Sequence, residues 1–189
     1  MRDHLKTFLE FLRLNRGASP HTVAAYHGDL DQFLAYLTLY TGRAQKDLVA
    51  GDCVLATIRG FLAELYRERL SRKSAARKLA AVRAFVRYLR REGVMEGNPG
   101  LLVVSPKVEN KLPAHLEISE MTALLETPDS STPLGCRDRA MLEVLYASGL
   151  RLSELVGLNM EHVNLSGRMV RVLGKGSKER VVPFNQTTA

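Results

Sequence analysis

Residues 71–93, with the sequence SRKSAARKLAAVRAFVRYLRREG, carry the clearest structural signal in the chain. On a helical wheel at about 100° per residue, one arc gathers apolar side chains: Ala75, Leu79, Val82, Val86 and Leu89. Only Lys78 strays toward that arc, and the other basic side chains gather on the opposite side: Arg72, Lys73, Arg77, Arg83, Arg87, Arg90 and Arg91. Ser71 can cap this helix, which we expect to run from about 72 to 92. One face should pack on a core while the other presents a basic surface.

The net charge of the chain is concentrated in and around this predicted helix. The sequence has 27 Lys and Arg against 20 Asp and Glu, which gives a formal charge of +7. Residues 67–91 alone hold ten basic residues and one acid, Glu68, so this segment accounts for the whole excess. A charge concentrated in this way indicates a polyanionic partner, most often nucleic acid. The alternative is a solvated basic helix that binds nothing in particular.

Apolar side chains recur at helical spacing in three earlier segments: 2–15, 20–40 and 53–68. Ser19 followed by Pro20 is a typical start for the second of them, an N-cap followed by proline in the first turn. Four or five helices within residues 1–104 favour a compact helical bundle. Residues 105–113, SPKVENKLP, are polar, bounded by prolines and without periodicity. We interpret them as an interdomain linker.

Residues 114–189 show helical periodicity followed by strand-like alternation, and this pattern predicts a mixed α+β domain. A short helix is expected from Ser119 to Leu125, then a loop over 130–136, then helices over two segments: 137–149 and 153–158. Alternating apolar and polar residues flank Gly174-Lys175-Gly176-Ser177, a pattern typical of a β-hairpin with strands over 168–173 and 179–184. The expected fold class is therefore mainly α: an N-terminal helical bundle followed by the start of an α+β domain with a β-hairpin.

Composition and spacing disfavour several classes of protein. No apolar run approaches the roughly 18–20 residues that a membrane span needs, and the N-terminus lacks the apolar core of a signal peptide. Cys53 and Cys136 lie far apart without metal-type spacing, so we expect two reduced, buried thiols in a cytoplasmic protein. A nucleotide-binding loop at Gly174-Lys175 is disfavoured, because the Walker pattern requires Ser or Thr after the Lys and a helix behind it.

Two motifs stand in the second half of the chain: YASGLRLSELVGL at 146–158 and GKGSKER at 174–180. The first half holds Ser19-Pro20-His21-Thr22 with Tyr26, Asp29 and Leu30, and LSRKS with AVRAF within residues 70–85. Together these segments resemble the tyrosine recombinase, or phage integrase, family, most closely its bacterial Xer-type members. The resemblance covers nearly the whole chain. It implies that residues 1–104 are a SAM-like core-binding domain and that residues 114–189 begin a catalytic domain.

The resemblance implies chemical roles for residues of the second half. Arg151 would clamp two non-bridging oxygens of a phosphorane-like transition state, which the planar fork of an arginine can do bidentately. Lys175 would donate a proton to the leaving 5′-oxygen, with Lys178 of the same loop as the alternative donor. Glu154, three residues after Arg151 and so on the same helical side, would orient active-site groups. Without the resemblance, Arg151 and Lys175 would be ordinary surface cations.

DNA contacts are expected in the first half of the chain. The basic helix and the resemblance together indicate seven DNA-binding residues: Thr22, Tyr26, Arg72, Lys73, Arg77, Arg83 and Arg87. A basic face of this kind would neutralise several phosphates, so its affinity should fall steeply with salt. The implied partners are double-stranded DNA and further copies of the protein, four protomers on two sites, with no membrane.

The implied activity is site-specific recombination through a 3′-phosphotyrosyl intermediate, which conserves the bond energy and requires no metal, ATP or other cofactor. The family also requires a His-x-x-Arg box and a nucleophilic tyrosine after the hairpin. All six tyrosines present precede the hairpin, and Tyr146 is expected in the core. We therefore expect this chain alone to bind DNA without cleaving it. The target sequence and the biological role, whether dimer resolution, integration or movement of a mobile element, are left open.

Two other functions are compatible with the sequence. A natural truncated protein could occupy or regulate recombination sites with the basic helix alone. A helical transcription factor unrelated to recombination would give no use to Arg151 and Lys175 together, so the paired motifs count against it.

Overall fold

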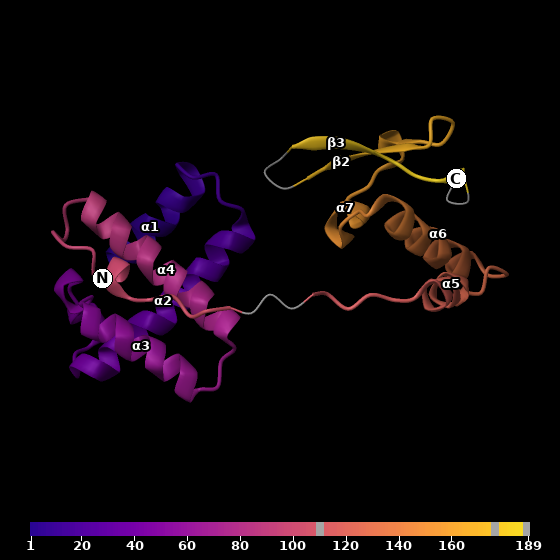
Figure 1. Cartoon of the computed structure of the whole chain (residues 1–189). Helices are drawn as coiled ribbons and strands as arrows, with labels where there is room; N and C mark the ends of the chain where they lie inside the picture. The colour runs from indigo at the N-terminus through magenta and orange to yellow at the C-terminus, as the bar shows by residue number, and fades with distance from the viewer. Residues whose placement is uncertain (109–111, 175–177, 187–189) are drawn as a thin grey trace. The chain divides into compact units, whose positions relative to one another are not determined.

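Four long helices form the first part of the chain, and Figure 1 shows them packed against one another. The computed structural model describes residues 1–108, 112–174 and 178–186, and the chain divides into two compact units, 1–111 and 112–189. The helices of the first unit, called the helical unit below, are α1 (Arg2–Leu14), α2 (Pro20–Thr41), α3 (Leu55–Arg67) and α4 (Arg72–Arg91). Three short 3-10 turns lie between or after them: η1 (Gln45–Asp47), η2 (Ala50–Asp52) and η3 (Pro99–Leu102).

The predicted helical bundle is confirmed, and each helix ends within two residues of its expected position. The Ser19 hydroxyl accepts a hydrogen bond from the Thr22 N–H at 3.2 Å, which satisfies one of the free donors in the first turn of α2. Ser71 does the same for the Ser74 N–H at 3.1 Å in α4. The predicted domain limits, 1–104, 105–113 and 114–189, stay a prediction.

The core of the helical unit lies between all four helices. The apolar arc predicted for α4 is buried, and Ala81 and Phe85 are buried with it. Phe85 contacts Phe8 of α1 with ring centroids 5.5 Å apart, and Phe33 of α2 contacts Phe61 of α3 at 5.1 Å. Because burying one large apolar side chain contributes about 1.5–3 kcal/mol, these four phenylalanines fix how the helices pack.

The second unit combines three helices with a small antiparallel sheet, seen at the orange and yellow end of the chain in Figure 1. Its elements are α5 (Ile118–Glu126), α6 (Pro133–Ser148), α7 (Leu152–Val156), η4 (Met160–His162), β1 (Val163–Asn164), β2 (Met169–Leu173) and β3 (Glu179–Pro183). The sheet order is β1-β2-β3, and β2 pairs with β3 from Met169↔Pro183 to Leu173↔Glu179. The predicted hairpin and the mainly α fold class are confirmed. The two-residue strand β1 was not predicted, because it is too short to show alternation.

The core of the second unit is small. Among the described residues of this unit, the buried apolar ones are Leu150, Val170, Val172 and Phe184. Val170 and Val172 alternate with exposed residues along β2, which is the period-2 pattern of a half-buried strand. Leu150 joins this core from the turn between α6 and α7, so the sheet fixes the position of that turn.

The predicted start of α6 was wrong. α6 begins at Pro133, inside the predicted loop, because the Thr132 hydroxyl caps it by accepting from the Gly135 N–H at 3.1 Å. A local side-chain cap therefore set this start earlier than the apolar pattern indicated. α5 begins at Ile118, one residue before the predicted Ser119, and the Glu120 carboxylate accepts from the Glu117 N–H at 2.8 Å at this end.

Two predicted burials were also wrong. Cys136 is exposed in the first turn of α6, whereas Cys53 is buried as expected, and burial raises the pKa of its thiol to about 12. Tyr146 is 56% exposed, because α6 packs on the core through Val144, Leu145 and Ala147 instead. Among the helices that the structure describes, none has the length and apolar composition of a membrane span.

Candidate active site and nucleic-acid interface

A tight turn between α6 and α7 positions Arg151. Gly149 ends α6 in the left-handed conformation, with φ 60°, which glycine adopts without the strain of a Cβ. Leu150 then anchors the turn in the core, and Arg151 follows in an extended conformation as the N-cap residue of α7. The Gly-Leu-Arg motif thus places a 62% exposed arginine on a fixed backbone.

Glu154 lies under this turn and is 4% exposed in its side chain. Its carboxylate accepts two hydrogen bonds from Arg151, one from the backbone N–H at 2.8 Å and one from Nη1 at 2.8 Å. It accepts two more from Arg180 of β3, from Nη1 at 2.7 Å and Nη2 at 2.9 Å. One buried carboxylate therefore links the turn that bears Arg151 to the hairpin.

The electrostatics of this cluster keep Glu154 ionised. The side-chain hydrogen bonds from Arg180, with those from the backbone and side chain of Arg151, lower the pKa of Glu154 to about 2. The cluster of two guanidinium groups and one carboxylate carries a net charge of +1 at neutral pH. Apart from the bond to Glu154, the guanidinium of Arg151 has no acceptor among the residues that the structure describes, so its other N–H groups can bind an anion.

Arg180 was not predicted as a site residue. Because successive strand side chains point to opposite faces, Arg180 shares a face with Val182 and Phe184. Phe184 is buried and Val182 packs on the core, so that face points inward. A basic residue on the inward face of a strand requires a buried acid, and this was the signal in the sequence that could have identified the pair.

Lys175 lies outside the described residues, and Lys178 is exposed at the other end of the same loop. The base of the loop is closed by a hydrogen bond from the Gly174 N–H to the Lys178 carbonyl at 2.7 Å. A Cβ on Gly174 would lie 3.2 Å from Arg180 Nη1 and 3.8 Å from Glu154 Oε1. The residue before Lys175 therefore lies against the Glu154 cluster.

The predicted DNA-binding residues of α4 fall into three groups. Arg72, Lys73 and Arg87 are exposed. Arg77 is half exposed, and its Nη1 donates to the Asp29 carboxylate of α2. Arg83 instead donates hydrogen bonds to the segment 100–105, which follows α4 in the chain. Its Nε donates to the Gly100 carbonyl at 2.8 Å, its Nη1 to the Ser105 hydroxyl at 2.6 Å and its Nη2 to the Val103 carbonyl.

The structure brings Thr22 and Tyr26 of α2 next to α4. A shallow pocket of about 350 Å³ is lined by both of them together with Arg77. A neighbouring pocket of about 420 Å³ is lined by the same two residues with Arg87, and Arg16 and Arg91 contribute further positive charge there. This joint face of α2 and α4 is the candidate nucleic-acid interface.

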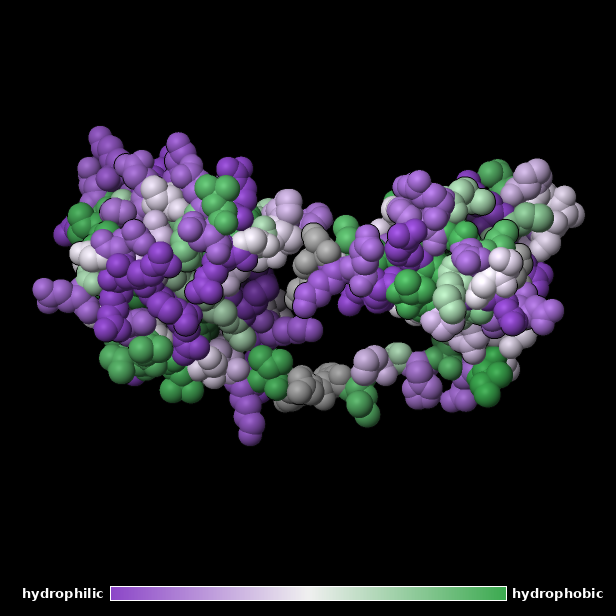
Figure 2. Space-filling view, turned by 90° about the horizontal axis from the view of Figure 1, so that it is seen from above, coloured by the Kyte–Doolittle hydropathy of each residue, from purple (hydrophilic) through white to green (hydrophobic). Residues whose placement is uncertain are grey.

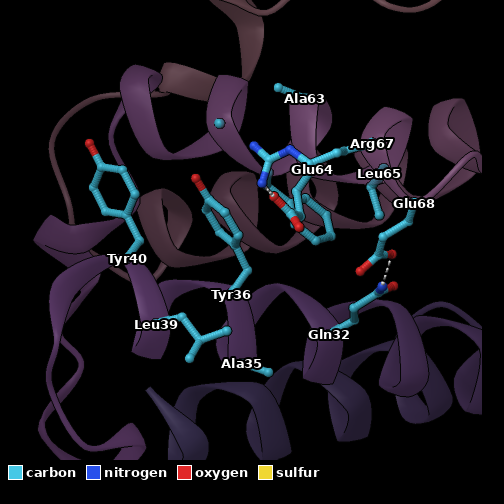
Figure 3. A pocket seen from close by; sticks show the side chains of 12 residues that line it. Gln32, Ala35, Tyr36, Leu39, Tyr40, Ala63, Glu64, Leu65, Arg67 and Glu68 are labelled. Carbon is cyan, nitrogen blue, oxygen red and sulfur yellow. Dashed lines mark hydrogen bonds and ion pairs between the residues drawn. The ribbon is translucent and has the colours of Figure 1, made fainter.

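A larger cavity, of about 610 Å³, lies elsewhere, between α2 and α3 (Figure 3). Tyr36 and Tyr40 line it, and the acids Glu64 and Glu68 outnumber the one basic residue, Arg67. Figure 3 shows Glu68 bonded to Gln32, at 3.2 Å. Because this cavity has no excess of positive charge, it is a poor match for a polyanion, and the α2–α4 face is the better candidate despite its smaller pockets.

Figure 2 shows hydrophilic side chains over much of the visible face of the helical unit, broken by small hydrophobic patches. In the residues that the structure describes, no group of three or more His, Cys, Asp or Glu side chains is arranged to hold a metal ion.

Comparisons with known proteins agree with these motifs. Residues 5–93 match the family model for the N-terminal SAM-like domain of phage integrases, and residues 115–189 match the phage integrase family model. The chain is 45% identical over 184 residues to tyrosine recombinase XerC of Pelobacter propionicus, covering 97% of this chain and 60% of the relative. It is 38% identical over 187 residues to XerD of Listeria monocytogenes, covering 99% of this chain and 62% of the relative.

Among solved structures, a λ integrase (75–356) dimer bound to a COC′ core site is similar in fold. Its TM-score is 0.70 at 17% identity, and the match covers 97% of this chain and 62% of that one. The chain spans about three fifths of the length of the curated relatives that it matches. Since both halves match family models of the phage integrases, this chain belongs to the phage integrase family of tyrosine recombinases, with Xer-type recombinases among its relatives.

Proposed function

We propose that the protein is a site-specific DNA recombinase of the Xer type, in which the helical unit grips duplex DNA and the second unit supplies part of the catalytic site. The observation that carries this proposal is the Glu154 cluster. It holds Arg151 on a glycine-ended turn and fixes the base of the Lys175 loop beside it. A surface arginine with no function in common with the hairpin would not need to share a buried carboxylate with Arg180.

In the proposed reaction, a tyrosine oxygen attacks the scissile phosphorus and the bond from phosphorus to the 5′-oxygen breaks. Arg151 uses its free N–H groups to bind the non-bridging oxygens, where negative charge develops in the transition state. The proton for the departing 5′-oxygen comes from Lys175, with Lys178 as the alternative. The 3′-phosphotyrosyl bond conserves the energy needed for religation, so no metal or nucleotide cofactor is required.

Glu154 and Arg180 act as positioning residues in this proposal. A guanidinium that has to meet two oxygens at once loses effectiveness if it rotates, and catalytic groups tolerate only small misplacement. Glu154 removes that freedom from Arg151, and Arg180 fixes Glu154 to the hairpin.

DNA binding is proposed for the joint face of α2 and α4. Arg72, Lys73, Arg77 and Arg87 would contact the duplex, with Thr22 and Tyr26 beside them. Arg83 is assigned a structural part, since its guanidinium already serves three acceptors in the 100–105 segment. Assembly of four protomers on two sites and a cytoplasmic location are proposed from the family resemblance.

The test uses the full-length protein and a nicked duplex that carries the site selected by the wild-type protein from randomised DNA. We expect Arg151→Ala to lower formation of the covalent protein–DNA complex by at least about 100-fold, with DNA affinity changed less than about threefold. Arg137→Ala, which removes an exposed arginine of α6, is the matched control and should cleave like the wild type. Equal cleavage by Arg151→Ala and the wild type would refute the catalytic assignment.

The 189-residue chain itself is proposed to bind DNA without cleaving it, because none of its six tyrosines lies in the sequence context of the family nucleophile. The alternative, a natural truncated protein that occupies or regulates recombination sites without cleavage, predicts that the wild-type protein as it occurs naturally forms no covalent complex on the nicked duplex. The same gel assay therefore separates the two functions.

A further inference from the structure

A buried carboxylate lies beneath the basic face of α4. The side chain of Asp29, in α2, is 4% exposed, and its two oxygens accept from different cations of α4. Lys78 Nζ donates to Oδ1 at 3.0 Å, and Arg77 Nη1 donates to Oδ2. Lys78 is itself largely buried, so this lysine already compensates the charge of Asp29. Arg77 is 53% exposed, so its bond to Asp29 orients a surface group rather than neutralising a buried one.

This contact distinguishes Arg77 from other cations on the same helix. Because Nη1 of Arg77 donates to Asp29, the opposite edge of the guanidinium, formed by Nε and Nη2, can still bind a ligand. This edge has no acceptor among the described residues. Lys73 and Arg87 have no carboxylate partner in the described part of the chain, so their long side chains keep their rotamer freedom. A guanidinium that is already oriented before binding loses less conformational entropy when it binds. It also favours ligands whose acceptors match its fixed geometry.

The surroundings of Arg77 suit the edge of a base pair. The pocket of about 350 Å³ beside it is lined by three alanines, Ala25, Ala80 and Ala81, which allow close approach and offer only methyl groups. In the major groove, guanine presents two acceptors that match the fork of an arginine, and thymine presents a methyl group that packs on alanine. A phosphate group would make no favourable contact with the apolar part of this pocket, because its charged oxygens require hydrogen-bond donors.

We propose that Arg77, oriented by Asp29, reads a guanine through Nε and Nη2, and that the alanine-lined pocket receives the neighbouring base with a preference for thymine. The inference rests on the proposed function, because it requires the α2–α4 face to meet duplex DNA. Arg77 then determines sequence, whereas Arg87 and Lys73 neutralise phosphates and position the helix. Asp29 is a positioning residue that acts through Arg77.

The experiment selects preferred duplexes from a randomised pool with the 189-residue wild-type chain, then measures the affinity of variants for the selected duplex and for versions with single guanines replaced. Arg77→Lys keeps the charge and the reach to Asp29 but removes the fork. Asp29→Asn keeps the shape and removes the anchor. Arg87→Lys is the matched control, because it makes the same chemical change at an unanchored position of the same helix.

We expect the wild type to prefer guanine at one position by about 10- to 100-fold. Arg77→Lys and Asp29→Asn should reduce that preference to below about threefold, because each removes either the fork or its anchor. Arg87→Lys should keep the preference. Circular dichroism establishes that each variant is folded. Because the Arg77 side chain is half exposed, Arg77→Lys tests the base-reading role even if Asp29→Asn is destabilised.

Two negative outcomes distinguish failure of the base-reading role of Arg77 from failure of the proposed function. If the wild type binds duplex DNA but Arg77→Lys retains its full guanine preference, or if no guanine preference is found, the base-reading role of Arg77 is overturned and the proposed function stands. If the wild type binds no duplex at all, the proposed function fails and this inference fails with it.

Discussion

The helical unit and the second unit differ in what holds their elements together. In the helical unit, Phe8, Phe33, Phe61 and Phe85 are each at most 2% exposed and connect all four helices. In the part of the second unit that the structure describes, four apolar residues are buried in the core, and large apolar side chains remain exposed on each of its helices, among them Ile118, Leu134, Tyr146, Leu152 and Val156. α7 and the hairpin are connected by the Glu154–Arg180 ion pair.

The proposed DNA-binding face therefore rests on an apolar core, whereas the proposed catalytic turn rests on a polar contact. A basic face on a closed apolar core can bind a large polyanion without rearrangement. The Arg151 turn, by contrast, depends on a polar contact between α7 and β3, and such a contact fixes geometry more than it adds stability. Each of the following predictions tests this contrast.

Amide hydrogen exchange should show the largest difference. Opening the helical unit exposes its whole core, whereas α5 has no buried residue, so amides of α2 and α4 should exchange at least about 1000-fold more slowly than those of α5. Mass spectrometry of peptides from the intact 189-residue chain measures both in one sample. Similar protection in α4 and α5 would show that the two units are equally stable.

Truncating one core phenylalanine in each unit should separate their energetics. Phe85→Ala should cost about 3–5 kcal/mol of unfolding free energy, because it leaves a large cavity among tightly packed rings. Phe184→Ala, at the 9% exposed edge of the smaller core, should cost less than half as much. Urea denaturation followed by circular dichroism gives both values. Equal costs would contradict the contrast between the two cores.

The pKa of the Glu154 carboxylate should be about 2, below the value of ~4.3 of an ordinary glutamate, because Arg180 and Arg151 donate hydrogen bonds to it. Because the folded pKa is depressed, the stability contributed by this group is fully present above pH ~4.3 and is lost as the pH falls toward 2. Carbon-13 NMR of labelled glutamate measures the midpoint. Arg180→Ala should move it upward and the control Arg137→Ala should not; a wild-type midpoint near 4.3 would mean that the cluster is not formed.

Removing one helix cap in each unit should give the smallest effects. Ser71→Ala and Thr132→Ala each delete a side-chain acceptor for an N–H in the first turn, at 3.1 Å in both helices. Each should cost about 1 kcal/mol. The loss should be spread over the whole cooperative helical unit for Ser71→Ala and confined to α6 for Thr132→Ala, as read from hydrogen exchange. Matching losses of protection throughout both units would indicate a single cooperative fold.

Local patterns in the sequence predicted much of this molecule. The α4 wheel, the Ser19 and Ser71 caps and the β2–β3 hairpin depend on neighbours within a few residues, so periodicity and turn chemistry were sufficient. The early start of α6 was missed because its cap lies in a polar segment without periodicity. The exposure of Tyr146 was missed because α6 is apolar on more than one side, and the sequence alone does not say which side packs.

Sequence alone established the helical bundle, the hairpin, the concentrated basic face and the Arg151 motif, because each is encoded in residues that are close along the chain. Tertiary structure was needed to pair Asp29 with Arg77, Glu154 with Arg180, and Arg83 with the 100–105 segment. Long arginine side chains can reach many acceptors, so only the folded backbone determines which carboxylate or carbonyl each one meets. That choice separates the arginine we propose to read bases from those that bind phosphate or stabilise the fold.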